Sequence, residues 1–413
     1  MLGIWQNYTS GLPDPRLAVS PVHTDHCQPG LPEAIAAWAA ALGFQQVGIT
    51  DLDLSAAGER LRAWLARGFH GEMGWMAHHG ELRERPDLLV PGAVSAICVR
   101  MDYRPADTRM IARLRDGESA YVSRYALGRD YHKLVRQRLA RLGERVAAAV
   151  GCAVIQRPFV DSAPVLEKPL AARAGLGWIG KNTLLLNREA GSWFFLGELI
   201  TSVRLPRSPA APADACGNCR ACLSICPTNA FPEPYVLDAR RCVSYLTIEH
   251  PGAIPEALRA AMGNRVFGCD DCQIVCPWNR FAKPTRENAF QPRHGLADAR
   301  LAELAQWSEA EFLDRTAGSP IRRIGHERWL RNLAVGLGNA PSSAPVLAAL
   351  AALRAHPSAL VREHVAWALA RHARRPGREI GNAGAGRIDS DGPEIDGSGI
   401  DGFGIDRSGT DGA

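Results

Sequence analysis

The sequence predicts three consecutive regions: an α/β (or α+β) domain, a cysteine-rich domain and an α-helical C-terminal domain. Three observations support this order. Helix and strand patterns alternate over residues 31–204, eight of the eleven cysteines fall within 216–276, and amphipathic helices fill 326–373. A chain of 413 residues is long enough for two or three such domains.

The first region interleaves helix and strand patterns, which is typical of an α/β domain. In some segments apolar residues recur at helical spacing, and in others they alternate. The predicted helices are 31–43, 57–71 and 130–151, and the predicted strands are 44–50, 94–103, 152–161 and 192–201. We assign residues 31–204 to this domain. The preceding residues, 1–30, are rich in proline and polar side chains, and we expect them to be poorly ordered.

Proline and alanine residues begin the second region, which we assign to 205–290. The third region, 291–375, contains apolar residues at i, i+3 and i+4 in three helical segments, 326–340, 344–357 and 359–373. Short breaks separate these helices, and together they resemble one or two helical-hairpin repeats of the HEAT type. The last segment, 376–413, is an acidic Gly/Asp repeat. It has too few repeats to stack as a calcium-binding β-roll, so we expect it to be disordered and dispensable.

The composition excludes two classes of protein. No apolar stretch approaches the roughly 18–20 residues of a transmembrane helix, and the first residues lack the pattern of a signal peptide. We therefore expect a cytoplasmic protein with reduced thiols, in which cysteines indicate metal ligands rather than disulfides. Residues 381–413 carry a net charge of −5, which leaves +10 on the rest of a chain whose total is +5. That excess suits a nucleic-acid partner, and equally an ordinary arginine-rich surface.

The cysteine spacing indicates two iron–sulfur clusters. The run C-x2-C-x2-C-x3-C-P of bacterial ferredoxins, in which the fourth cysteine binds the other cluster, is matched in full by Cys216, Cys219, Cys222 and Cys226. A second run, Cys269, Cys272 and Cys276, lacks its first cysteine, because Val266 occupies that position. Two [4Fe–4S] clusters need eight thiolates, and Cys242, between the runs, can supply the eighth.

The crossed ligation pattern then assigns the cysteines to two sets. The first cluster would be held by Cys216, Cys219, Cys222 and Cys276, and the second by Cys226, Cys242, Cys269 and Cys272. Zinc is the alternative, because paired C-x2-C units often form zinc ribbons. It does not explain two C-x3-C-P endings with an eighth cysteine between them. We interpret the remaining cysteines as packing residues rather than ligands: Cys27, Cys98 and Cys152.

The stretch 161–187, "DSAPVLEKPLAARAGLGWIGKNTLLLN", is the candidate for chemistry in the first region. Asp161 ends an apolar strand, and an acid there points into the crevice where α/β folds bind ligands. The alternative is that Asp161 caps the helix that follows. The region has neither G-x-G-x-x-G after a strand nor a P-loop, so neither a dinucleotide nor ATP is indicated.

Four segments together resemble the epoxyqueuosine reductase family, whose members are cobalamin-dependent iron–sulfur enzymes of tRNA modification. They are the Asp161 stretch, "SRYALGRDYHKLVRQRL", the double cysteine run with "CVSYLTIEH", and "GSPIRRIGHERWLRNLAVGLGNA". The resemblance covers about residues 31–370, with the segments in the family's order. A reductive dehalogenase and a simple electron carrier are the competing interpretations. The first usually has an export signal, and the second leaves the α/β domain unexplained.

The resemblance implies a function and a mechanism. The α/β domain would bind base-off cobalamin, reduced through the two clusters by a low-potential electron donor. The substrate would be tRNA with epoxyqueuosine at the wobble position, converted to queuosine in the cytoplasm by a monomeric enzyme without a membrane partner. Asp161 resembles the family's proton donor. For that role we expect burial in the crevice to raise its pKa.

The resemblance also suggests contacts. For cobalamin, the candidates are Asp161, Lys181, Asn182, Tyr131 and His132. His132 is either an axial cobalt ligand or a residue at a helix N-terminus that bonds backbone or cofactor amides, and we favour the second because the family implies no lower histidine ligand. For tRNA phosphates, the candidates are Arg322, Arg323, Arg328 and Arg331, whose alternative is an ordinary solvated helix face.

Overall fold

A computed structural model describes residues 29–106, 109–210 and 214–375. The described residues from 29 to Arg374 form one compact unit. The predictions for 1–28, including Cys27, and for the tail from 376 onward lie outside the described residues. No helix among the described residues is both long enough and apolar enough to cross a bilayer.

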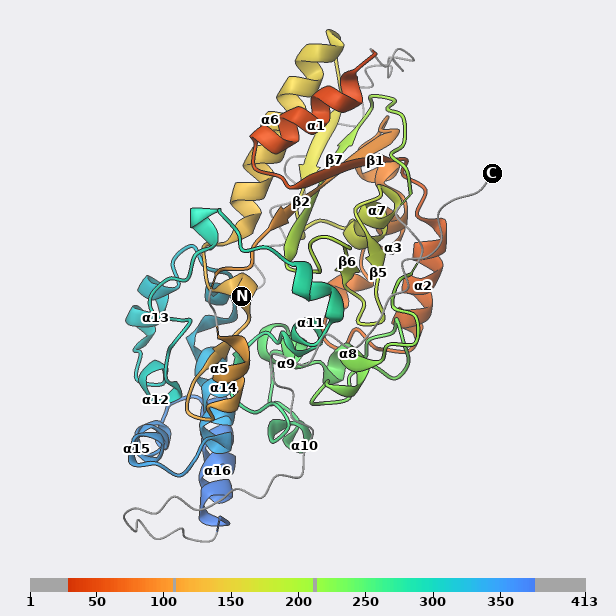
Figure 1. The fold of residues 1–413 in the computed structure, drawn as a ribbon. Coiled ribbons are helices and arrows are strands. Elements are labelled where there is room, and N and C mark those ends of the chain that lie inside the picture. The colour runs from red at the N-terminus through yellow and green to blue at the C-terminus, as the bar shows by residue number, and fades with distance from the viewer. Residues whose placement is uncertain (1–28, 107–108, 211–213, 376–413) are drawn as a thin grey trace, which may run out of the picture. The chain divides into compact units, whose positions relative to one another are not determined.

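A four-stranded sheet forms the centre of the N-terminal region (Figure 1). Its order is β1 (Gln46–Thr50), β2 (Ser95–Asp102), β7 (Phe194–Thr201) and β4 (Gln156–Phe159), and every pair is antiparallel. The domain is therefore α+β. Our argument for placing Asp161 in a crevice was wrong in its premise, because the crevice rule concerns parallel sheets. Asp161 nevertheless follows directly on the edge strand β4.

Helices cover both faces of this sheet (Figure 1). On one face, α1 (Leu31–Ala41) and α6 (Tyr131–Val150) share a core with the strands, and on the other face α2 (Ser55–Ala66) and α7 (Glu167–Arg173) do so. The buried face of α6 repeats at intervals of three and four, as an amphipathic helix requires: Val135, Leu139, Leu142 and Val146. Its first residues are thereby placed next to the end of β4.

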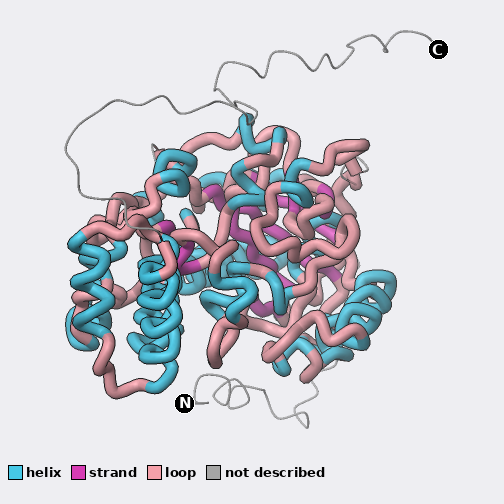
Figure 2. The backbone as a smooth tube through the Cα atoms, turned by 90° about the horizontal axis from the view of Figure 1, so that it is seen from below, coloured by secondary structure: helices cyan, strands magenta, loops and turns pink. Residues whose placement is uncertain are grey.

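Apart from the three C-terminal helices, the remaining elements are short, and loops connect them over much of the path (Figure 2). The helices are α3 (Gly80–Glu84), α4 (Pro86–Leu89), α5 (Met110–Arg115), α8 (Ala221–Ser224), α9 (Val243–Ile248), α10 (Glu256–Arg259), α11 (Asp271–Ile274), α12 (Leu301–Leu304), α13 (Glu309–Arg315), α14 (Gly325–Asn339), α15 (Ala344–Leu353) and α16 (Ala359–Ala373). The strands are β3 (Tyr121–Val122), β5 (Trp178–Ile179), β6 (Leu185–Leu186) and β8 (Arg265–Phe267).

The cysteine-rich region shares structure with both of its neighbours. Strand β3 of the first region pairs in parallel with β8, which lies between Cys242 and Cys269. Helix α14 packs on β8, and its buried residues Trp329, Leu333 and Leu337 belong to the same core as Val122. Boundaries at 204 and 290 therefore stay assignments made from sequence, since one hydrophobic core runs across them.

Candidate active site

One group of thiols surrounds Cys222. Burial raises the pKa of Cys222 to about 11, and the charges of three neighbouring thiolates contribute to this rise. The three are Cys276, Cys216 and Cys219. Such interactions require the four sulfurs to be close together, because the charges of distant groups are screened. The grouping is consistent with the set predicted for the first cluster.

A second group surrounds Cys272. Burial, and then the charge of Cys242, raises the pKa of Cys272 well above its usual value, and Cys226 contributes in the same direction. The pKa of Cys269 is also raised well above its usual value, by burial first and with Cys272 among its charged neighbours. This grouping is consistent with the second predicted set. Cys222 of the first group also acts on Cys272, so the two groups adjoin.

All eight thiols of the two groups are free cysteines in the structure. The choice between clusters and zinc rests on their spacing along the chain, which gives two C-x3-C-P endings with an eighth cysteine between them. Outside these sets, Cys98 is buried in β2 as predicted, whereas Cys152 is exposed and does not pack in a core.

Lys181 and Asn182 bind the cysteine loops. Lys181 Nζ donates to the carbonyl of Gly217 and, at 2.9 Å, to that of Cys219. Asn182 is 3% exposed, and its Nδ2 donates to the carbonyl of Cys272 at 3.3 Å. We predicted direct cofactor contacts for both side chains. In the structure their polar groups hold the two cysteine loops against the β5–β6 turn, and a direct contact of either side chain with the cofactor stays a prediction.

Replacing Lys181 by Met should loosen the first cysteine loop. The variant loses two hydrogen bonds to carbonyls that flank Cys216 and Cys219, so we expect faster loss of iron from the first cluster on exposure to chelator. Lys133→Met, the same change at an exposed position of α6, is the matched control. Iron release followed by absorbance measures the effect, and equal rates for the two variants would contradict the anchoring role.

The backbone of Asp161 is held in an unusual conformation. Its φ of 55° lies in the left-handed region, which few non-glycine residues adopt and which marks functional sites when the surroundings hold it. The Asp161 N–H donates to Glu167 Oε1, and the following N–H, of Ser162, donates to the carbonyl of Val160. The capping alternative for Asp161 is wrong, because α7 begins after Leu166 and has no side-chain cap.

The carboxylate of Asp161 binds two side chains from the start of α6. The Tyr131 hydroxyl donates to Oδ2, and His132 Nε2 lies 3.4 Å from the same oxygen. Tyr131 is 8% exposed and stacks on Phe195, with ring centroids 3.8 Å apart. On the other side of the imidazole, Nδ1 lies 2.6 Å from Asp130 Oδ1. Asp130 in turn caps α6 by accepting from the backbone N–H of His132.

These contacts reverse our expectation for the pKa of Asp161. Burial does raise it, but the hydrogen bond and charge of His132, the hydrogen bond of Tyr131 and the charge of Arg323 outweigh burial, so the pKa is lowered. Burial would lower the pKa of His132, yet hydrogen bonds to Asp130 and Asp161 raise it to about 10. At neutral pH the proton of this pair therefore resides on His132. Both imidazole nitrogens face carboxylates, which favours the helix N-terminal interpretation over an axial ligand.

Two acids beneath Asp161 were not predicted. Glu198 is completely buried in β7, and burial followed by the charge of Glu167 raises its pKa well above the usual value. Burial, and then the charge of Asp161, raises the pKa of Glu167 to about 7. A lone acid in the apolar strand "WFFLGELIT" was the signal that could have found Glu198.

Lys168 connects this group of acids to the second set of cysteines. Its Nζ donates to the carbonyl of Thr183 at 2.8 Å. Burial lowers the pKa of Lys168, and the charges of Asp161, Glu167 and Cys272 oppose this effect. Lys168 and Asp161 are both exposed by surface area, with 58% of the Asp161 side chain accessible, yet the surrounding protein removes much of their hydration. We refer to the region around Asp161 and Lys168 as the crevice.

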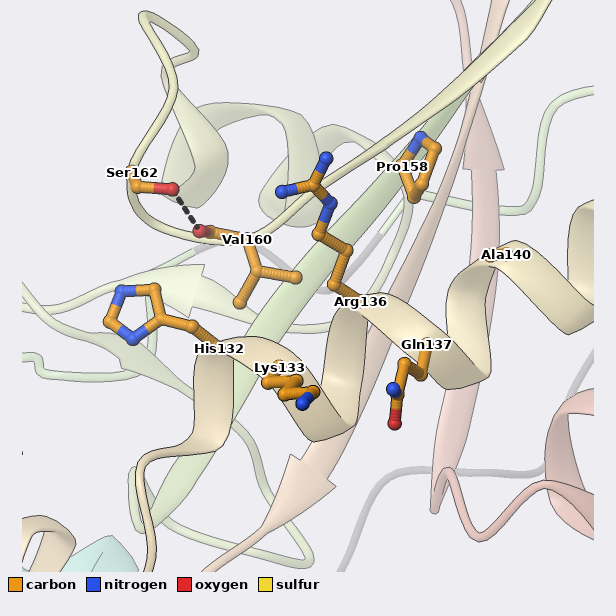
Figure 3. A pocket seen from close by; sticks show the side chains of 8 residues that line it. All are labelled: His132, Lys133, Arg136, Gln137, Ala140, Pro158, Val160 and Ser162. Atoms are coloured by element: carbon orange, nitrogen blue, oxygen red, sulfur yellow. Dashed lines mark hydrogen bonds between the residues drawn. The ribbon is translucent and has the colours of Figure 1, made fainter. Parts of the chain in front are cut away.

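A cavity of about 550 Å³ adjoins His132 (Figure 3). Figure 3 shows side chains from α6 on one side and from β4 and its following loop on the other. Its volume is in the range of ligand sites, and it combines hydrogen-bonding groups with apolar walls. The lining residues are His132, Lys133, Arg136, Gln137, Ala140, Pro158, Val160 and Ser162.

Comparison with known proteins identifies this arrangement. A family model described as "4Fe-4S double cluster binding domain" matches residues 215–279, and one described as "Epoxyqueuosine reductase QueG, DUF1730" matches 83–162. A Pseudomonas aeruginosa epoxyqueuosine reductase is 65% identical over 342 residues, which cover 83% of this chain and 94% of that protein. The chain belongs to the epoxyqueuosine reductase family. It is an oxidoreductase with a double [4Fe–4S] cluster domain.

Other epoxyqueuosine reductases agree with this placement. The Escherichia coli enzyme is 56% identical over 347 residues, with coverage of 84% of this chain and 90% of that protein. A solved epoxyqueuosine reductase with an epoxyqueuosine-modified tRNA-Tyr stem loop has a TM-score of 0.75 and 30% identity, covering 83% and 90% of the two chains. The Bacillus subtilis structure, at 27% identity, the same TM-score and the same coverage, is described with an aspartate catalytic loop swung out of the active site.

The four arginines predicted to bind tRNA have unequal positions in this epoxyqueuosine reductase. Arg331 is fully buried, and its guanidinium donates to the carbonyls of Leu246, His250 and Gly252, so a phosphate contact by Arg331 is wrong. Arg328 and Arg322 donate to backbone carbonyls, at 2.7 Å to Ile324 and 2.6 Å to Leu313 respectively. Arg323 is half exposed and pairs with Glu249, and its charge also acts on Asp161. Among these four, Arg323 is the one that faces the active site.

Replacing Arg331 by Met should lower stability rather than tRNA affinity. The change leaves three carbonyls without their donor and removes a buried guanidinium, which should cost roughly 3 kcal/mol. Thermal unfolding and tRNA binding by the folded variant check this expectation. A stable variant with weakened tRNA binding would instead support a contact between Arg331 and a tRNA phosphate.

Proposed function

We propose that this epoxyqueuosine reductase removes the epoxide oxygen of epoxyqueuosine in tRNA with cobalamin that is reduced through the two [4Fe–4S] clusters. The observation that carries the proposal is that Asp161, Lys168 and Cys272 lie near one another. The Asp161 carboxylate pairs with the imidazole of His132, and the charges of both Asp161 and Cys272 act on Lys168. Proton donor and electron source thus face the same space.

The residues of the crevice fit a large cofactor rimmed with amides. Lys168 and the backbone around Thr183 offer polar contacts, and Val160 and Pro158 offer apolar ones near Asp161. We propose that Lys168, Asp161 and His132 lie around the bound cofactor. Cobalamin, when bound and reduced, supplies the electrons to the substrate.

The residues of this chain would act as follows. The eight cysteines hold the clusters, and Cys272 places the second cluster on the side of Lys168 and Asp161. Glu167 holds the Asp161 backbone, and Tyr131 orients its carboxylate. Asp161 transfers a proton to the epoxide oxygen as its bond to carbon breaks, which avoids a free alkoxide.

The substrate and partners follow from the same proposal. A relative binds an epoxyqueuosine-modified stem loop, and we propose that this chain binds the anticodon of its tRNA so that the wobble base reaches Asp161. Arg323 would attract the substrate's phosphates at the mouth of the crevice. A low-potential electron donor in the cytoplasm would reduce the clusters. We also propose that the enzyme is a monomer.

Cobalamin binding tests the cofactor assignment. We expect the cluster-loaded chain to retain cobalamin through gel filtration. The electron paramagnetic resonance spectrum of the bound cob(II)alamin should lack nitrogen superhyperfine splitting, as a base-off cofactor without a histidine ligand would show. Splitting from an axial nitrogen would overturn the base-off assignment, and absence of binding would favour the electron-carrier interpretation.

A further inference from the structure

We propose that His132 relays protons from Asp130 and solvent to Asp161, so that one carboxylate delivers both protons of the reaction. This inference rests on the proposed function, in which Asp161 is the group that protonates the epoxide oxygen. It assigns to His132 a role that acts through Asp161 and requires no contact with cobalt.

The stoichiometry of the reaction creates the need for a relay. Converting an epoxide to an alkene breaks two carbon–oxygen bonds, forms one carbon–carbon π bond and releases the oxygen as water. The conversion takes up two electrons, which the external donor supplies through the clusters, and two protons. A carboxylic acid carries only one transferable proton. Asp161 must therefore be reprotonated within each turnover, at a time when the bound tRNA covers the crevice.

The geometry supplies a continuous path. Asp130 Oδ1 lies 2.6 Å from His132 Nδ1, and His132 Nε2 lies 3.4 Å from Asp161 Oδ2. The side chains of His132 and Asp130 are 36% and 38% exposed, and His132 also lines the cavity of Figure 3. The path thus begins at groups that solvent reaches and ends at the acid in the crevice.

The position of His132 on α6 makes its proton transferable. His132 is the second residue of the helix, where the helix dipole disfavours a positive charge. The two flanking carboxylates overcome this effect and hold the imidazolium at neutral pH, because together they raise the pKa of His132 to about 10. Once the proton passes to Asp161, the imidazole that remains is the form that the helix end prefers.

The charged surroundings hold the proton on His132 before the reaction begins. Asp130 and Tyr131 face His132 from α6, and Asp161 faces it from the loop after β4. Glu167 of α7 and Arg323 before α14 act on Asp161, while Lys133 and Arg136 line the cavity beside the ring.

The buried acids beneath Asp161 do not offer a second path. Glu167 accepts from the backbone N–H of Asp161 rather than from its carboxyl group. Glu198 is completely buried and so cannot exchange its proton directly with solvent. The Asp161 side chain is itself 58% accessible in the free chain, so the path through His132 is needed once the bound tRNA covers it.

Chemical rescue tests the relay in the fully loaded enzyme with its tRNA substrate. His132→Ala should lower turnover by about 10²-fold or more, and added imidazole should restore part of it because the cavity beside the ring admits a small base. The rescued rate should change with the pKa of substituted imidazoles. Gln137→Ala, in the same cavity, is the control, and imidazole should not change its rate. Absence of rescue, with His132→Gln as active as the parent chain, would overturn the relay.

The alkaline limb of the pH–rate profile gives a second test. Asp130→Asn removes one of the groups that raise the pKa of His132, so the limb should move to lower pH than in the parent chain. An unchanged limb would contradict the relay, because a purely structural Asp130 would lower the rate without moving the limb.

Titration of the imidazole separates this inference from the proposed function. In the cluster-loaded chain with ¹⁵N-labelled histidine and no tRNA, the His132 signal, assigned with His132→Gln, should stay that of an imidazolium through pH 8. A titration at or below about 6.5 would overturn the relay, even if the parent chain converts its tRNA substrate. Failure of the parent chain to convert the tRNA would instead contradict the proposed function.

Discussion

Replacing Asp161 by Asn should lower turnover by about 10²- to 10⁴-fold, the usual contribution of a positioned general acid. Asn keeps the size of the side chain and can still accept the hydrogen bond from Tyr131. It cannot pass on a proton. Opening the epoxide would then leave a charged oxygen in a site that hydrates charges poorly. Single-turnover conversion of epoxyqueuosine tRNA, followed by mass spectrometry of the nucleosides, measures the loss.

Binding measurements decide whether this loss is chemical. The variant should retain iron, cobalamin and tRNA affinity within a few-fold of the parent chain, because Asp161 contributes no cysteine ligand and its loop is held by Glu167. Turnover within a few-fold of the parent chain would remove Asp161 from the proton-donor role. Loss of cobalamin binding would instead assign it to the cofactor site.

Replacing Cys242 by Ala should abolish turnover and remove about half of the iron. Cys242 is the only cysteine between the two runs, and it lies among the thiols of the second group. Without it the second cluster has three thiolate ligands and is expected to be lost, which interrupts the path of electrons toward Cys272 and Lys168. Iron and sulfide analysis and the spectrum of the dithionite-reduced chain measure the effect.

Cys152→Ala is the matched control for that experiment. Cys152 is exposed at the turn between α6 and β4, apart from either cysteine group. The control should keep the full iron content and full turnover. A Cys242→Ala chain that also kept its full iron would require another eighth ligand and would contradict the crossed assignment.

The parts of the site that could be predicted are those that depend on spacing along the chain. The cysteine runs specify two ligand groups before any fold is known, and the structure brings the thiols of the runs and Cys242 near one another. The helix at 130–151 was predictable because its buried residues repeat at helical intervals. The helix at 326–340 was predictable from the same spacing of its apolar residues, although every residue from Trp329 to Gly338 is buried. Strand direction was not predictable in this way, because alternation marks a strand without saying how it pairs.

The parts that could not be predicted depend on what a side chain meets after folding. Arg331 has the sequence context of a surface helix, yet it is buried because the carbonyls around His250 lie over it. Lys181 and Asn182 belong to a glycine-rich loop, and the cysteine loops fold onto them. The lowered pKa of Asp161 depends on Tyr131 and His132, thirty residues earlier in the chain.

Conversion of the tRNA nucleoside tests the central claim most directly. The chain would be loaded anaerobically with iron, sulfide and cobalamin and incubated with epoxyqueuosine tRNA and a strong reductant, and the nucleosides would be read by mass spectrometry. We predict loss of one oxygen atom from the modified nucleoside, dependent on both cobalamin and reductant. An unchanged epoxyqueuosine mass from a chain that holds both clusters and cobalamin would contradict the account.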